Sequence, residues 1–142
     1  MTNVEFHILE SAEGDMAYQQ LIGQHIQEHY RQSRKIYIQA KDQEQAEAID
    51  EWLWSQELSD FIPHNLVGEG PNKPPPVQIG FTEPPENQHD VLINLCDQVQ
   101  SFFSYFLTCI EIVPNNDQAK EEARLRYKYY RSHGYPLKHQ KH

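Results

Sequence analysis

Short apolar runs alternate along this chain with segments whose apolar residues recur at helical spacing, and this alternation constrains the fold more than any other feature. Residues 4–9 begin with alternating apolar and polar side chains, which predicts a strand. Four further runs are predicted as strands: residues 35–39, 77–81, 91–95 and 108–113. Strands separated by helices favour a parallel or mostly parallel sheet that is covered on both faces.

The predicted helices lie between these strands. Residues 18–30 carry apolar side chains three and four residues apart, which indicates an amphipathic helix. Asp42, followed by Gln45 three residues later, predicts the start of a second helix that carries Ala46, Ile49 and Leu53 on one face. Residues 98–106 and 117–133 are also predicted as helical. The long irregular section, residues 61–76 and 82–89, holds seven of the nine prolines, so the 142-residue chain is predicted to form a single domain.

The charge of the chain is unevenly distributed. The net charge is −9, but from residue 118 onward seven Lys or Arg face two Glu, which gives +5 and leaves −14 for the first 117 residues. Such an acidic body repels nucleic acid, so sequence-specific binding of nucleic acid is not expected. No apolar run approaches the ~18 residues of a membrane span, and the expected location is cytoplasmic. The two cysteines, Cys96 and Cys109, are expected to be buried free thiols.

The last predicted helix carries cations on one side. At 100° per residue, Ala119, Ala123 and Tyr130 form the predicted buried face, and one stripe beside it collects four cations and one aromatic side chain. This basic stripe consists of Lys120, Arg124, Tyr127, Lys128 and Arg131. A solvated helix face with cations near the helix C-terminus would explain it. However, a surface helix usually mixes charges of both signs, so the stripe favours a binding surface for an acidic partner.

Two sequence patterns would indicate an enzyme. A nucleotide site in this fold class needs a glycine-rich turn after the first strand, but residues 10–15 hold one glycine and three acids. No nucleotide site and no cofactor are therefore expected. His25, Glu28 and His29 match the H-x-x-E-H pattern of a metal-dependent hydrolase. A polar helix edge is the favoured interpretation of this motif, and a small metal-dependent hydrolase is the alternative function.

A tryptophan pair precedes the proline-rich section. Trp52 follows Ile49 by three residues and is expected in the core, whereas Trp54 falls near the opposite side of the helix. An outward Trp54 close to Phe61 and Pro63 has the composition of a protein-binding hot spot. Packing of both tryptophans under the proline run is the other interpretation, and the residues alone leave the two open.

Two phrases in the sequence resemble a known family. The first runs from residue 61 to 71, FIPHNLVGEGP, before a short predicted strand. The second comprises Val113 with Pro114 and the segment ARLRYKYYR over residues 123–131. The chain resembles the chi subunit family of bacterial DNA polymerase III from its first strand to about Tyr135. The resemblance implies a single-domain, three-layer α/β/α fold of Rossmann-like topology without a nucleotide site over residues 1–135, leaving 136–142 as a flexible basic, histidine-containing tail.

The resemblance also implies partners. In the chi family the protein is a non-catalytic accessory subunit that joins the clamp-loader complex through the psi subunit. It also binds the acidic C-terminal tail of single-stranded DNA-binding protein, which ends in a phenylalanine with a free carboxylate. By resemblance the tail would bind at Val113, Lys120, Arg124, Tyr127, Lys128 and Arg131. The psi subunit, or alternatively an iron–sulfur helicase of the XPD-like type, would bind at Trp54, Phe61 and Pro63.

Overall fold

Seven parallel strands form one sheet in the computed structural model, which describes residues 1–10, 14–55, 62–68, 75–85 and 89–142. The strand order is β3-β4-β2-β5-β6-β1-β7. The strands are β1 Asn3–Ile8, β2 Ile36–Gln39, β3 His64–Leu66, β4 Val77–Gly80, β5 Val91–Asn94, β6 Thr108–Val113 and β7 Leu137–Lys141. The helices are α1 Asp15–Arg31, α2 Gln43–Ser55 and α3 Asp117–Ser132, with a short 3₁₀-helix η1 at Phe103–Tyr105. The predicted single-domain α/β fold is thus confirmed, and the described strand pairs are all parallel.

The helix starts follow the residues that cap them. Asp42 Oδ1 accepts a hydrogen bond from the Gln45 backbone N–H at 2.8 Å, and Gln45 Oε1 accepts one from the Lys41 N–H at 2.8 Å. The predicted start of α2 is confirmed, since these bonds satisfy backbone donors that a helix N-terminus leaves free. At α3, Asn116 plays the same part by accepting from the Ala119 N–H at 2.8 Å.

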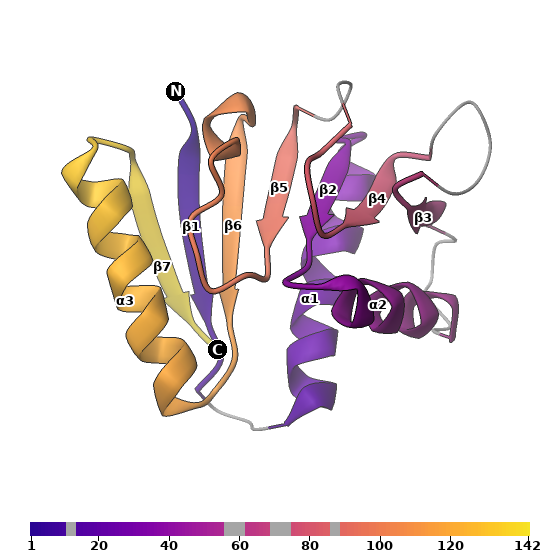
Figure 1. Cartoon of the computed structure of the whole chain (residues 1–142), viewed down its shortest axis with the longest axis horizontal. Helices are drawn as coiled ribbons and strands as arrows, with labels where there is room; N and C mark the ends of the chain where they lie inside the picture. Colours follow the sequence, from indigo (N-terminus) through magenta and orange to yellow (C-terminus); the bar gives the residue numbers. More distant parts are fainter. Residues whose placement is uncertain (11–13, 56–61, 69–74, 86–88) are drawn as a thin grey trace.

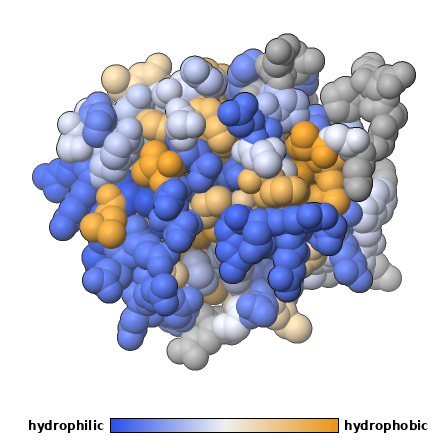
Figure 2. All heavy atoms as spheres, in the orientation of Figure 1, coloured by the Kyte–Doolittle hydropathy of each residue, from blue (hydrophilic) through white to orange (hydrophobic). Residues whose placement is uncertain are grey.

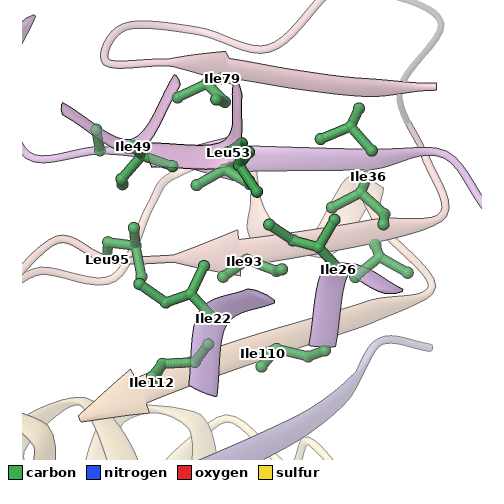
Figure 3. Close-up of a cluster of buried hydrophobic side chains, with 14 of the residues drawn as sticks. Ile22, Ile26, Ile36, Ile49, Leu53, Ile79, Ile93, Leu95, Ile110 and Ile112 are labelled. Atoms are coloured by element: carbon green, nitrogen blue, oxygen red, sulfur yellow. The ribbon is translucent and has the colours of Figure 1, made fainter. Parts of the chain in front are cut away.

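The two faces of the sheet carry different cores. Because side chains alternate along a strand, each strand contributes to both. On one face, α1 and α2 bury isoleucine and leucine side chains against β2, β4, β5 and β6 (Figure 3). On the other face, α3 and the segment around η1 pack aromatic side chains against β1, β5 and β6. Figure 1 shows α1 and α3 on opposite faces of the sheet.

The structure corrects three sequence predictions. Residues 98–106 were predicted to be helical, but they form turns and the short η1. Phe102, Phe103 and Phe106 all point into the core, and the local backbone hydrogen bonds join residues three apart, as in a 3₁₀-helix. Residues 64–66 of the proline-rich section form the edge strand β3. Residues 136–142 were predicted to be a tail, but most of them form β7, which pairs with β1 from Val4–Leu137 to Ile8–Lys141.

Polar composition explains why β7 was missed. Its sequence is LKHQK and its side chains are mostly exposed, so it lacks the apolar alternation by which strands are predicted. Instead, β7 is held by backbone hydrogen bonds to β1 and forms one edge of the sheet. Lysines on an edge strand hinder its pairing with other chains. None of the described helices is long and apolar enough to cross a membrane.

Candidate functional site

A pocket of about 240 Å³ opens between α3 and the edge of the sheet, and we call it the α3 pocket. It is lined by Phe6, Ile8 and Glu10 from β1 and its end, Val113 from β6, Lys120, Ala123, Arg124 and Tyr127 from α3, and His139 and Lys141 from β7. Most of the surface over α3 is hydrophilic (Figure 2). The pocket therefore lies where a largely hydrophilic helix face meets the end of the sheet.

The floor of the α3 pocket is apolar. Phe6 and Val113 are buried and belong to the aromatic core beneath α3. Tyr127 stands edge-on to Phe6, with ring centroids 5.3 Å apart, and its other neighbour is His139 at 6.3 Å. Aromatic rings prefer edge-to-face packing of this kind, so an aromatic side chain of a ligand can pack on these rings in the same way. The floor and wall can hold an apolar or aromatic side chain.

The rim of the α3 pocket carries more positive than negative charge. Lys120 Nζ and Lys141 Nζ each lie 3.9 Å from a carboxylate oxygen of Glu10, and Arg124 is exposed beside them. Three cations and one carboxylate thus share the rim. A surplus of positive charge at the mouth of an apolar pocket suits a ligand with an apolar group next to an anionic one.

The structure brings together four of the six residues predicted to bind the acidic tail: Val113, Lys120, Arg124 and Tyr127 all line the α3 pocket. The other two, Lys128 and Arg131, are exposed further along α3 and do not line it. Sequence reasoning missed His139 and Lys141, because β7 was taken for a tail. Alternation along β7 would have placed both on one side, had the strand been recognised.

A buried ionic network positions α3 against the sheet. Arg126 Nε donates to Glu111 Oε1 at 3.0 Å, while Tyr130 Oη and Asn94 Nδ2 donate to Oε2 at 2.6 and 3.0 Å. Arg126 also donates to the carbonyl of Asp97 at 3.1 Å. Burial raises the pKa of Glu111, and the charge of Arg126 and the hydrogen bonds from Tyr130 and Asn94 oppose that rise. A polar residue in the middle of an otherwise apolar strand was the only signal of this network in the sequence.

The predicted psi-facing surface is only partly described. Trp54 is 56% exposed, which settles its orientation: it lies outward, whereas Trp52 packs on the core beside Gly23. The Trp54 ring lies 4.4 Å from that of His64, which is buried, and Pro63 is half-buried. Phe61 lies outside the described residues. We call Trp54, Pro63 and His64 the Trp54 patch.

The histidines of the H-x-x-E-H motif are arranged differently from a hydrolase site. His25 and His29 are buried with ring centroids 6.5 Å apart, and Glu28 is exposed. Arg34 Nη1 lies 2.9 Å from His29 Nδ1 and donates a hydrogen bond to it. Burial, together with the neighbouring His7, lowers the pKa of His25 to about 4. The alternative of a metal-dependent hydrolase built on this motif is not supported.

The fold and the α3 pocket define a parallel α/β domain with a small apolar pocket rimmed by cations. Comparison with known proteins then identifies its family: residues 1–138 match the family model of the DNA polymerase III chi subunit, HolC. Curated relatives named DNA polymerase III subunit chi include that of Escherichia coli K12, 35% identical over 96% of both chains. That of Pseudomonas aeruginosa PAO1 is 34% identical over 96% of this chain and 94% of the relative, and that of Haemophilus influenzae Rd is 38% identical over 76% of each. The chain belongs to the chi subunit family of DNA polymerase III and is a DNA replication protein.

Proposed function

We propose that this chain is a cytoplasmic, non-catalytic accessory subunit of DNA polymerase III, linking the replisome through psi to the acidic C-terminal tail of single-stranded DNA-binding protein. Membership of the chi family supports the place of the chain in the polymerase complex. The α3 pocket is the observation that carries the proposed tail binding, because it joins an apolar floor to a cationic rim.

The tail would enter the α3 pocket with its terminal phenylalanine. An apolar cavity of about 150 Å³ can hold a benzene ring, so a pocket of about 240 Å³ has room for a phenylalanine side chain. Its ring would pack on Val113 and Tyr127. Its carboxylate would accept a charge-assisted hydrogen bond from Arg124 or Lys120, which is stronger than a neutral one.

Acidic residues of the tail would follow the exposed part of the basic stripe. Lys128 and Arg131 lie beyond the pocket along α3, where they can attract such residues without enclosing them. Exposed ion pairs contribute only ~0.2–1 kcal/mol each and are screened by salt. Specificity therefore has to come from the phenylalanine in the sheltered pocket.

A peptide titration tests this proposal. The peptide is the acidic tail ending in phenylalanine. It is compared with the same peptide without that residue and with versions in which one aspartate is neutralised. Deleting the phenylalanine should weaken binding more than any single neutralisation. Raising salt to physiological strength should weaken binding without abolishing it, because the packed ring is not screened. Equal binding of the shortened peptide would leave the stripe as a general anion attractor and overturn the pocket assignment.

The Trp54 patch would receive psi. Tryptophan is enriched among interface anchors, Trp54 is exposed, and the patch lies on α2 and at the start of β3, away from α3. An XPD-like helicase would compete for the same surface. Pull-downs of the full chain with psi and with the helicase, separately and together, test the assignment: if both bound at once without loss of either, a shared surface would be excluded.

A further inference from the structure

Three histidines from distant parts of the chain meet on the face of β1 opposite the α3 pocket. His7 lies on β1, His25 on α1, and His142 directly after β7. One ring nitrogen of each lies within 4.8 Å of the others, and within the described ranges this is the one such group of His, Cys, Asp or Glu side chains. We call it the histidine cluster.

Strand alternation explains why the histidine cluster faces α1. Phe6 and Val4 belong to the core beneath α3, so their neighbours Glu5 and His7 point to the other face, which α1 covers. The backbone of His142 extends the sheet: its N–H donates to the Ile8 carbonyl at 2.8 Å, and its carbonyl accepts from the Glu10 N–H at 2.7 Å. These bonds fix the backbone of His142, and the contact of its ring with His7 places that ring in the cluster before any ligand binds.

Glu5 leaves His7 with a nitrogen suited to coordination. His7 Nε2 lies 3.3 Å from Glu5 Oε1, and because a carboxylate can only accept, Nε2 carries the hydrogen. Nδ1 then keeps its lone pair, and it faces His142 Nε2 at 3.0 Å. A carboxylate that accepts from one nitrogen of a histidine while the other binds a metal is a common arrangement around protein metal ions.

His25 completes the cluster, and one of its ring nitrogens lacks a partner. The residue is 8% exposed, its ring centroid lies 4.1 Å from that of His7, and its Nδ1 is buried without a hydrogen bond. Buried polar atoms are nearly always paired, so a buried, unpaired nitrogen on a ring that also touches His7 fits a residue that can bind a ligand. Imidazole nitrogens are ligands for zinc, copper and nickel.

We propose that His7, His25 and His142 form a site for a divalent transition-metal ion, zinc being the probe of choice. In a tetrahedral centre with Zn–N bonds of 2.0–2.1 Å, ligand nitrogens lie about 3.3 Å apart, so the widest separation in the cluster has to close by at most about 1.5 Å. Rotation of the imidazoles supplies movement of this size. The adjoining groove, also lined by Gln24, Glu28 and Thr108, leaves the fourth position open to water.

A metal at this place would fasten β1, α1 and β7 to one another. The edge strand β7 gains most, since β1 is the one described strand with which it pairs. The ligands come from β1, α1 and the residue after β7, so an ion bound to all three opposes opening of that edge.

Zinc binding to the tag-free full-length chain tests the proposal. The chain is dialysed against micromolar zinc with a weak chelator, and bound metal is counted per chain; cobalt(II) absorption reports the coordination number. One equivalent of zinc and a tetrahedral or five-coordinate cobalt spectrum are expected, with a rise in melting temperature on adding zinc. His142→Gln should lower the affinity by more than the roughly 10–100-fold that loss of an outer partner costs, and Glu5→Gln by about 10-fold.

His139→Gln is the matched control, because His139 lies on the same strand but lines the α3 pocket. It should bind zinc like the unaltered chain. His142 is only half-buried and Glu5 is not fully buried, so these variants stay informative even if replacing His7 or His25 prevents folding. Retention of less than one zinc per chain, or the same affinity in His142→Gln and His139→Gln, would overturn the site and assign any bound metal to scattered surface histidines.

Discussion

The two faces of the sheet are held in different ways. Beneath α1 and α2 the contacts are between aliphatic side chains, and Figure 3 shows isoleucines of β2, β4, β5 and β6 interleaved with those of the two helices. Beneath α3 the core is aromatic and encloses the Glu111 carboxylate with the Arg126 guanidinium. The core of the first face is held by aliphatic packing, whereas the core of the second combines packing with buried directional bonds.

The difference matters for the α3 pocket. Aliphatic side chains can slide and repack, so they fix the position of a helix on the sheet only through the shapes of the packed surfaces. Hydrogen bonds from Arg126 and Tyr130 to Glu111 fix where α3 sits along β6. Since α3 supplies one wall of the pocket and β6 part of its floor, we infer that the ionic network sets the pocket width. A buried ion pair is weak evidence for stability, and its value here is in orientation.

The largest expected effect comes from breaking the ionic network on the α3 face. Arg126→Met leaves the Glu111 carboxylate buried without its cation, which should lower the free energy of unfolding by about 3–5 kcal/mol. Urea denaturation measures this loss. Because Arg126 opposes the rise in the pKa of Glu111, its removal should raise that pKa further.

The pH dependence of this loss has a definite sign. A carboxyl whose pKa is higher in the folded than in the unfolded state binds its proton more tightly when folded, so its contribution to stability improves as pH falls below the folded-state pKa. The difference between Arg126→Met and the unaltered chain should thus shrink in mildly acid buffer. The control is Ile93→Val on the aliphatic face, which should cost about 0.5–1.5 kcal/mol at either pH. If Arg126→Met cost no more than that, the contrast between the faces would be wrong.

The next effect concerns association rather than folding. Trp54→Ala should weaken binding of psi by about 2 kcal/mol, as loss of an exposed aromatic anchor commonly does. Since Trp54 is 56% exposed, the melting temperature should change little. Calorimetric titration of psi measures the loss, and Leu125→Ala, which removes an exposed apolar side chain from α3, is the control. A variant that binds psi normally, or that unfolds, would contradict an interface role for Trp54.

Much of the α1 and α2 face could be predicted from the sequence. Its strands and helices bury aliphatic side chains at regular spacing, and that spacing is what periodicity detects: Ile49 and Leu53 were placed correctly, and so was the Asp42 cap. The buried face of α3 was predicted through Ala123 and Tyr130. Arg126, however, is buried by its pairing with Glu111, and no local pattern identifies a partner fifteen residues away.

Periodicity predicted the candidate site only where it lies on α3, and the family resemblance added Val113 of β6. The stripe on α3 follows from helical geometry, so Lys120, Arg124 and Tyr127 were found. Lys141 was not, because β7 forms through backbone pairing with β1 and its side chains carry no apolar signal. The histidine cluster was invisible for a similar reason: its members are brought together by strand order, which neither composition nor spacing reports.

The smallest expected effects separate pocket residues from the remainder of the stripe. Arg124→Gln and Lys141→Gln each remove one rim cation and should weaken binding of the tail peptide by ~0.2–1 kcal/mol, up to about fivefold in affinity. Part of that loss should disappear at high salt. Arg131→Gln lies outside the pocket, so its loss should be smaller and should vanish at high salt. Fluorescence anisotropy of a labelled tail peptide at two salt concentrations resolves these differences. Equal losses for all three variants would mean that the peptide senses only the total charge of α3 and β7. The α3 pocket would then contribute nothing specific to the binding of the peptide.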